Sequence, residues 1–300
     1  MTLAKTFESK ADLKAERSSS AVCHKKSTGK RRGAALFIRI LVYVCATLTL
    51  GILAFMLGYI LVKGVPYLNK DLFSFKYTSD NCSVIPALAN TLIMTLLALA
   101  IATPLGIGSA IYLVEYAKKG NKFVKVVRLT TETLTGIPSI IYGIFGMLLF
   151  VVFFKWGYSL LAGSCTVAIM ILPTIMRTTE EALLAVPDSF REGSFGLGAG
   201  KLRTVFKVVL PSAVPGILSG IILATGRVVG ETAALIYTAG TVAQIPKNVM
   251  GSGRTLAIHM YVLSSEGLHT NQAFATAVVL LILVIGINAL ANLVARRIQK

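Results

Sequence analysis

The strongest constraint on this chain is a series of apolar runs, each long enough to cross a lipid bilayer as one helix. The runs cover residues 34–62, 85–114, 127–155, 157–176, 212–240 and 273–295. A helix needs about 20 mainly apolar residues to span the hydrocarbon layer. Backbone groups in lipid must hydrogen-bond within their own segment, which favours helices over open strands. The sequence therefore predicts an all-α integral membrane protein with six transmembrane helices.

Composition agrees with a protein of the bilayer rather than with a nucleic-acid-binding one. Hydrophobic residues make up 55% of the chain and charged residues 14%, and the mean hydropathy is +0.74. The formal net charge is +17, but 9 of the 30 basic residues lie in the first 33 positions and most others flank apolar runs. The four cysteines and three histidines are scattered, so neither a disulfide framework nor a metal site is expected.

The distribution of basic residues predicts the orientation of the spans. Residues 1–33 are polar and basic without apolar periodicity, and we expect them to form a disordered basic cytoplasmic tail. Residues 34–62 follow as the first transmembrane helix, because this run is longer than a signal-peptide core and lacks a cleavage site. With both termini inside, the inner segments hold 22 Lys and Arg against 6 in the outer segments. This excess predicts cytoplasmic N- and C-termini.

A polar interruption at residues 178–211 is too regular to be a simple connection. It contains two Ser/Thr-x-x-Glu pairs, a spacing that typically starts helices: Thr178 with Glu181 and Ser189 with Glu192. It then has glycines that permit a sharp turn, followed by valines on one face of a further helical turn, at positions 196, 198 and 200 and at 205, 208 and 209. The interruption is therefore predicted to form a shaped cytoplasmic segment of short helices.

Two ionisable residues, Arg227 and Glu231, lie inside the apolar run 212–240. An ionisable group at membrane depth is costly and commonly marks a transport pathway. Because the two residues are four positions apart, we expect them to share one helix face and to pair. Arg227 then either offers its guanidinium to a passing oxyanion, with Glu231 holding it in place, or forms a structural bridge with Glu231 between helices. The residues alone leave both readings open.

Proline and glycine are expected to break two of the spans. Residues 103–108, TPLGIG, interrupt the second run, and residues 135–139, TGIPS, begin the third. Freed backbone groups at membrane depth are tolerated only where they are buried in protein or line a water-filled cavity. The breaks fit either a transport pathway or simple packing kinks.

The spacing within residues 192–211 resembles the EAA loop of ABC-importer membrane subunits. The matching points are Glu192, Gly198, Leu210 and Pro211; the chain departs from the pattern at Gly193 and Ser194, where the family has two alanines, and at Val208, where it has isoleucine. The resemblance implies the ABC transmembrane type-1 (MetI-like) permease fold over residues 85–295, with the coupling helix in the EAA loop 178–211. It also implies that the four matching residues couple the chain to an ATPase.

Three further segments resemble phosphate-specific ABC permeases of the PstA type: residues 226–233 (GRVVGETA), 135–143 (TGIPSIIYG) and 111–117 (IYLVEYA). This resemblance implies a permease that translocates inorganic phosphate across a bacterial plasma (inner) membrane, with Arg227 and Glu231 on the substrate pathway. The implied partners are a second permease subunit (PstC type), an ATPase dimer (PstB type) and an extracytoplasmic phosphate-binding protein (PstS type). ATP and Mg would be bound by the ATPase, so no cofactor is expected in this chain.

An enzyme, a secondary transporter and a structural or receptor membrane protein are the alternatives. An enzyme is disfavoured because Gly200-Lys201 lacks the rest of a phosphate-binding P-loop and Ser219 is misplaced for a nucleophile elbow. A secondary transporter needs no ATPase dock and usually carries an inverted repeat. A structural protein would not account for Arg227 and Glu231 beside a shaped cytoplasmic segment. We therefore expect a non-catalytic transport subunit.

Overall fold

The computed structural model describes residues 28–118 and 120–298, and the chain divides into two units, residues 1–59 and 60–300. Of the predicted disordered tail, residues 1–27 lie outside the described part. The prediction is wrong for residues 28–33, because they form the start of helix α2, Thr28–Gly64. Lysine and arginine are good helix formers, so these basic residues extend the apolar helix that follows them.

The second unit, as far as it is described, consists of helices and connecting loops. Its elements are η1 (Val65–Tyr67), η2 (Lys70–Phe73), α3 (Ile85–Ile111), η3 (Tyr112–Tyr116), α4 (Lys122–Thr135), α5 (Ser139–Gly146), η4 (Met147–Phe153), α6 (Leu160–Leu184), α7 (Asp188–Gly196), α8 (Lys201–Thr204), η5 (Val205–Val209), α9 (Leu210–Val229), α10 (Ala233–Ile236), α11 (Leu256–Glu266) and α12 (Thr270–Ile298). The predicted all-α fold is confirmed.

Five helical segments are long and apolar enough to cross a membrane. They are Ala35–Tyr67, Ile85–Tyr116, Leu160–Leu184, Lys201–Val229 and Thr270–Leu293. A sixth span is reached if α4 and the α5–η4 segment are counted together, although the two meet at an angle of 102°. The six predicted spans thus correspond to five helices and one bent pair.

The bend between α4 and α5 confirms the predicted break at residues 135–139. Pro138 disfavours helical geometry in the residue before it, and α4 ends at Thr135. The hydroxyl of Tyr142, on α5, donates a hydrogen bond of 2.8 Å to the carbonyl of Leu134, on α4. The bond crosses the bend and satisfies one of the backbone acceptors that the end of α4 leaves free.

The second predicted break, at residues 103–108, is wrong. Helix α3 continues through Pro104 and ends at Ile111. Gly106 serves packing here, because a Cβ atom at this position would lie 2.8 Å from Cγ2 of Ile175 on α6. Of the two readings of this segment, the structure favours close helix packing.

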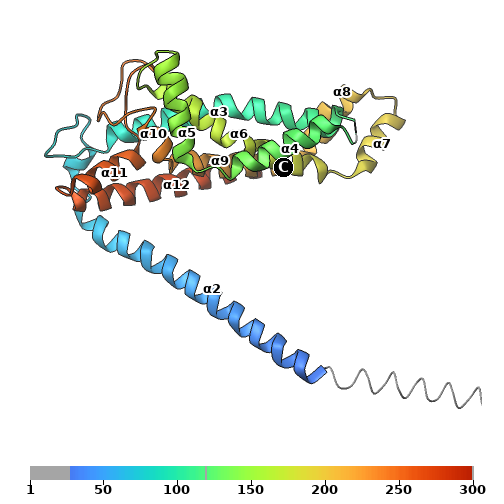
Figure 1. Ribbon diagram of the computed structural model, residues 1–300, viewed down its shortest axis with the longest axis horizontal. Helices are drawn as coiled ribbons and strands as arrows, with labels where there is room; N and C mark the ends of the chain where they lie inside the picture. The colour runs from blue at the N-terminus through green and yellow to red at the C-terminus, as the bar shows by residue number, and fades with distance from the viewer. Residues whose placement is uncertain (1–27, 119, 299–300) are drawn as a thin grey trace, which may run out of the picture. The chain divides into compact units, whose positions relative to one another are not determined.

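The core of the second unit lies between α3, α6 and α9 (Figure 1). Large apolar side chains from α3 and α6, such as Met94 and Ile171, are fully buried in it. Alanines on the same helices, Ala98, Ala102 and Ala224, are also buried. Small residues at such positions let helix backbones approach closely, which is how helices associate in membranes without a hydrophobic driving force.

The closest helix contact on α9 generates a stability prediction. A Cβ at Gly220 would lie 2.0 Å from the Thr178 hydroxyl oxygen, whereas a Cβ at Gly226, on the same helix, would meet nothing within 4 Å. Gly220→Ala should therefore destabilise the detergent-solubilised protein by about 1–3 kcal/mol through overpacking. Gly226→Ala should leave stability unchanged or raise it by up to about 1 kcal/mol, since alanine favours the helix. Equal shifts of the two thermal unfolding midpoints would contradict this packing.

Candidate coupling segment and pathway residues

The predicted cytoplasmic segment forms one end of the second unit, where α7 and α8 lie away from α10 and α11 (Figure 1). Helix α7 ends at Gly196 and α8 begins at Lys201. Gly198, between them, has a φ of +80°, which L-residues rarely adopt. The predicted sharp turn is therefore present, and Gly198 is the residue that makes it.

The first predicted helix start is wrong, whereas the second lies one residue after the first residue of α7 but lacks the predicted capping box. Thr178 and Glu181 lie inside α6, where the Thr178 hydroxyl donates to the Thr174 carbonyl at 2.9 Å and Glu181 pairs with Arg177 at 3.0 Å. Helix α7 starts at Asp188 after Pro187, and no side chain caps it. Pro187 supplies the fixed φ that suits a helix start. Because the helix begins at Asp188, Ser189 lies inside it and the Ser189–Glu192 capping box is not formed.

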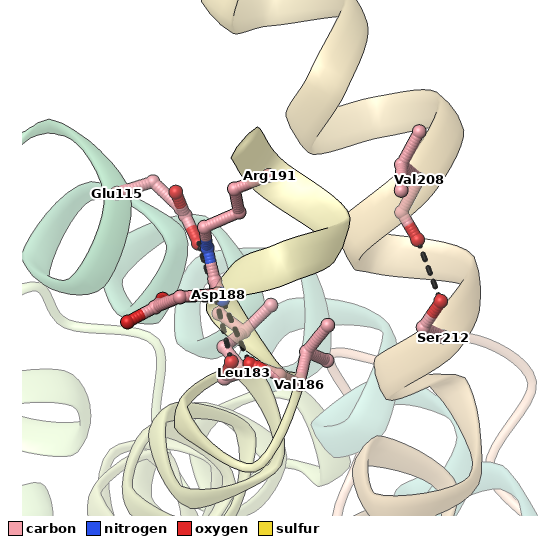
Figure 2. A network of polar contacts seen from close by, with 7 residues as sticks. All are labelled: Glu115, Leu183, Val186, Asp188, Arg191, Val208 and Ser212. Atoms are coloured by element: carbon pink, nitrogen blue, oxygen red, sulfur yellow. Dashed lines mark hydrogen bonds and ion pairs between the residues drawn. The ribbon is translucent and has the colours of Figure 1, made fainter. Parts of the chain in front are cut away.

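Leu210 and Pro211 lie at the start of α9, where the segment was predicted to end. They belong to the continuous helical stretch Lys201–Val229, which leads from the turn into the core. The hydroxyl of Ser212 donates to the Val208 carbonyl at 2.7 Å and helps to hold this stretch together (Figure 2). Proline is tolerated here because it stands in the first turn of α9, after a stretch of wider π-type hydrogen bonding.

Arg191, which the sequence reading did not single out, holds α7 in place (Figure 2). Its Nε and Nη2 atoms donate to one carboxylate oxygen of Glu115, on η3, at 3.1 and 2.8 Å. Nη2 also donates to the Leu183 carbonyl at 2.9 Å, and Nη1 to the Val186 carbonyl at 2.8 Å. A fifth bond, of 3.2 Å, joins Nη1 to Asp188 on α7 itself. One guanidinium thus ties α7 to the end of α6 and to the extension of α3.

This ion pair is shielded from water, because the side chains of Arg191 and Glu115 are only 15% and 9% exposed. Charge-assisted hydrogen bonds of this kind are among the strong ones in proteins. Two contacts brace the other side of the segment. The hydroxyls of Ser194 and Thr204 lie 2.8 Å apart, and the Lys201 ammonium lies 5.1 Å from the centre of the Tyr116 ring. The segment is therefore a fixed part of the bundle rather than a free loop.

The outer face of the segment carries exposed apolar side chains. Leu197, at the tip of the turn, is 91% exposed. Four further large apolar residues of α7, α8 and η5 are exposed: Phe190, Phe195, Leu202 and Phe206. We call these five residues the apolar tip. Glu192 and Gly198 are also exposed, on α7 and in the turn. Large apolar side chains exposed on one short segment are typical of a protein interaction surface.

The predicted pairing of Arg227 with Glu231 is wrong. Helix α9 ends at Val229, with Gly230 as its last cap, so the two residues do not share a helix face. No ion pair joins them in the described part of the chain. Glu231 is buried, and its Oε1 accepts a hydrogen bond of 3.1 Å from the Ala234 amide at the start of α10. A carboxylate at a helix N-terminus is favoured by the free amides there.

The structure instead brings Arg227 to the bent pair. Arg227 is partly buried and precedes Val228, which belongs to the same buried apolar cluster as Tyr142 on α5. Next to Tyr142, Gly143 packs against α10 so closely that a Cβ would lie 2.8 Å from Cα of Ala234. Residues 135–143 and 226–234, which are distant in the sequence, therefore form one site at two helix breaks.

The Arg191 cluster generates a prediction with a control inside the same chain. Arg191→Gln leaves the buried Glu115 carboxylate without its cation, which should cost about 3–5 kcal/mol of stability. Arg177→Gln removes an ion pair whose side chains are 57% and 63% exposed, and should change stability little. Adding Glu115→Gln to Arg191→Gln should recover part of the loss. Thermal unfolding of the purified variants measures all three, and an Arg191→Gln midpoint equal to that of Arg177→Gln would refute the buried pair.

Comparisons with known proteins bear on the same region. The sequence profile of the family described as "Binding-protein-dependent transport system inner membrane component" matches residues 102–300. This range contains the segment formed by α7, the turn and α8, together with the Arg191 cluster and the Arg227 site.

Two relatives are similar over most of their length. The chain is 35% identical over 245 residues to the probable ABC transporter permease protein YqgI of Bacillus subtilis. The alignment covers 75% of this chain and 81% of the relative. It is also 35% identical over 205 residues to the phosphate transport system permease protein PstA of Mycobacterium leprae, covering 67% of each.

A solved structure supports the fold. One chain of an inward-facing structure of the MetNI methionine ABC transporter aligns with a TM-score of 0.55 and 22% identity, over 81% of this chain and 97% of that one. The predicted MetI-like architecture is thereby confirmed at the level of the fold. Together with the match of the family profile over two thirds of the chain, these likenesses establish that the protein belongs to the binding-protein-dependent transport system inner membrane components, the multi-pass permease subunits of ABC importers.

Proposed function

We propose that this chain is the PstA-type permease of an importer for inorganic phosphate. The observation that carries the proposal is the site at the two helix breaks, where Val228, next to Arg227, shares a buried cluster with Tyr142 and Gly143 packs against Ala234. Both break segments have the motifs that led to the PstA resemblance, and a phosphate permease is among the relatives at 35% identity. A planar guanidinium donates paired hydrogen bonds to tetrahedral oxyanions, so Arg227 is the residue we assign to the substrate pathway.

In this proposal Glu231 caps α10 and is not an ion-pair partner of Arg227. It is buried at the turn between α9 and α10 and accepts a hydrogen bond from Ala234. By capping α10, Glu231 stabilises the interruption between α9 and α10 that follows Arg227. Within the described residues the guanidinium of Arg227 forms no ion pair, so it can exchange one anion for the next. Both residues remain pathway residues, with Arg227 as the binding group and Glu231 as a positioning residue.

The apolar tip, with Glu192 and Gly198, is proposed to dock on a PstB-type ATPase dimer. ATP and Mg bind to that ATPase, and this chain is a non-catalytic subunit without a cofactor of its own. A PstC-type second permease and a PstS-type phosphate-binding protein complete the transporter. The membrane is the bacterial plasma (inner) membrane, and the excess of basic residues near the α7 end supports cytoplasmic N- and C-termini.

Transport in this proposal is alternating access driven by the ATPase. Closure of the ATPase dimer on ATP displaces the apolar tip. Because Arg191 joins α7 to η3 and to the end of α6, the displacement is passed to α3 and α6 rather than absorbed in the turn. Closely packed helices respond by switching between discrete arrangements, which opens the pathway on the opposite side.

The docking surface is tested by two leucines that are similarly exposed at opposite ends of the unit. Leu197 is 91% exposed at the apolar tip, and Leu268, between α11 and α12, is 82% exposed. Leu197→Asp should lower co-purification of the ATPase subunit at least tenfold, because it places a charge in an apolar contact. Glu192→Lys should abolish uptake while the protein stays in the membrane. Leu268→Asp should retain the ATPase. Equal co-purification of the ATPase subunit with Leu197→Asp and Leu268→Asp would show that the apolar tip is not the docking surface.

The substrate is tested with the assembled transporter in proteoliposomes. Phosphate-loaded binding protein should stimulate ATP hydrolysis, and sulfate should not. Arg227→Gln should reduce phosphate transport by about tenfold or more, the effect of losing one charge-assisted contact. Arg177→Gln, which removes an exposed arginine, is the matched control and should transport normally. Stimulation by sulfate instead of phosphate would retain the ABC importer and remove phosphate from the proposal.

A further inference from the structure

Another arginine, Arg254, belongs to the connection between α10 and α11, two helices that lie at the end of the second unit away from α7 (Figure 1). The residue is only 4% exposed. Its backbone is held on both sides, since its amide donates to the Val242 carbonyl at 2.9 Å and its carbonyl accepts from the Asn90 amide group at 3.1 Å. The guanidinium carbon lies 4.6 Å from the centre of the Tyr77 ring. Arg254 is therefore a fixed, buried cation.

Two donor atoms of this guanidinium, Nε and Nη2, are buried without a hydrogen-bond partner. They stand on the same edge of the guanidinium plane, which is the edge that binds an oxyanion side-on. Arg191 uses the same two atoms to hold Glu115. For Arg254, none of the carboxylates in residues 28–118 and 120–298 forms an ion pair. Because a buried charge is costly unless it is paired, an anion from outside these residues is a suitable counter-ion.

Three residues linked to Arg254 also carry unpartnered polar atoms: Asn90 bonds to the Arg254 carbonyl, Thr255 is the next residue, and His259 shares the Tyr77 ring with Arg254. Nδ1 of His259, Oδ1 of Asn90 and the hydroxyl of Thr255 are also buried without partners. The Tyr77 ring joins the cluster, since it lies under Arg254 and meets the His259 ring edge-on at 6.1 Å. Five of the seven buried side-chain atoms that lack partners in the described residues thus belong to Asn90, Arg254, Thr255 and His259.

His259 is neutral in this cluster. Burial lowers the pKa of its imidazole to about 3, with the positive charge of Arg254 acting in the same direction. Its Nε2 lies 3.1 Å from the Cys82 carbonyl, which accepts but cannot donate, so Nε2 carries the proton. Nδ1 is then left as a lone acceptor. The cluster therefore offers a fork of two N–H donors, one hydroxyl, and acceptors that suit an oxygen bearing a proton.

We propose that Arg254, Thr255 and His259 form a second oxyanion site, which holds the substrate at the end of the permease opposite to the ATPase dock. The ligand class is a tetrahedral oxyanion that keeps a proton at neutral pH, such as inorganic phosphate. The fork binds two ionised oxygens, and His259 Nδ1 accepts from the protonated one. A fully ionised oxyanion such as sulfate would leave that acceptor unpaired. The identity of the ion rests on the proposed function, whereas the existence of an anion site rests on Arg254 alone.

Because the site is enclosed in this structure, we expect it to take up an anion in only one state of a transport cycle. Tyr77 belongs to the connection between η2 and α3, and it covers the guanidinium in this structure. Movement of that connection opens the fork to an arriving anion, and its return shuts the anion in. Arg254 then receives the anion first, and Arg227, at the helix breaks, receives it next.

Thermal unfolding of the purified full-length chain, with inorganic phosphate as the probe and sulfate as the control, tests the site. A ligand that binds the folded state raises the midpoint, by roughly 5 °C at a concentration about 100 times its Kd. We expect this rise with phosphate for the wild type and for Arg177→Gln. Arg254→Lys should reduce the rise, because lysine keeps the charge and loses the fork. Arg254→Met should abolish it.

Basal stability separates a binding role from a structural one. If Arg254 awaits a ligand, Arg254→Met removes an unpaired buried charge and its midpoint without phosphate should equal or exceed that of the wild type. A large loss of basal stability in Arg254→Met, with the phosphate rise kept in Arg254→Lys, would overturn the site. A phosphate rise that disappears in Arg227→Gln but persists in Arg254→Met would also overturn it, while supporting phosphate as the substrate. Phosphate-stimulated ATP hydrolysis by the assembled transporter judges the proposed function separately.

Discussion

The fork that Arg191 forms with Glu115 is the interaction on which the rest of this structure depends. It connects α7, the end of α6 and the extension of α3 through one guanidinium shielded from water. Without the fork, α7 would be held only by the short connection to α6 and by the turn at Gly198, and a force applied to it would be absorbed in these two connections. With the fork in place, a force on the apolar tip acts on two core helices. Breaking a buried pair of this kind is strongly destabilising, which makes the connection rigid.

A buried guanidinium thus appears at each end of the second unit, in opposite states. Arg191 has every described donor occupied by the chain itself, and so serves as a mechanical joint. Arg254 keeps its side-on edge open, which suits a group that gains and loses a ligand. Arg227 stands between these extremes, because it is partly buried and forms no ion pair within the described residues. The difference lies in whether the fold places a carboxylate beside the arginine.

Local sequence signals predicted the features that local physics decides. Apolar runs located the helices, Gly198 located the turn, and Pro138 located the bend. The same reasoning failed where packing outweighed propensity: Pro104 lies inside a helix, and the Thr178–Glu181 capping signal lies within α6. It also failed for Arg191 and Glu115, which are 76 positions apart and meet only in the fold. The predicted pairing of Arg227 with Glu231 failed because the helix ends at Gly230, which lies between them.

Rigid transmission through the coupling segment is the central claim, and a distance measurement tests it most directly. Spin labels would be placed at two exposed positions, Leu197 at the apolar tip and Tyr112 on η3, after replacement of the four native cysteines. Pulsed electron paramagnetic resonance on the assembled transporter would compare the nucleotide-free and ATP-bound states. We predict the same narrow distance distribution in both states, and a broadened one once Arg191→Gln is added. A wild-type distance that changes between the two states would contradict the claim, because the segment would then move independently of the helices it is meant to drive.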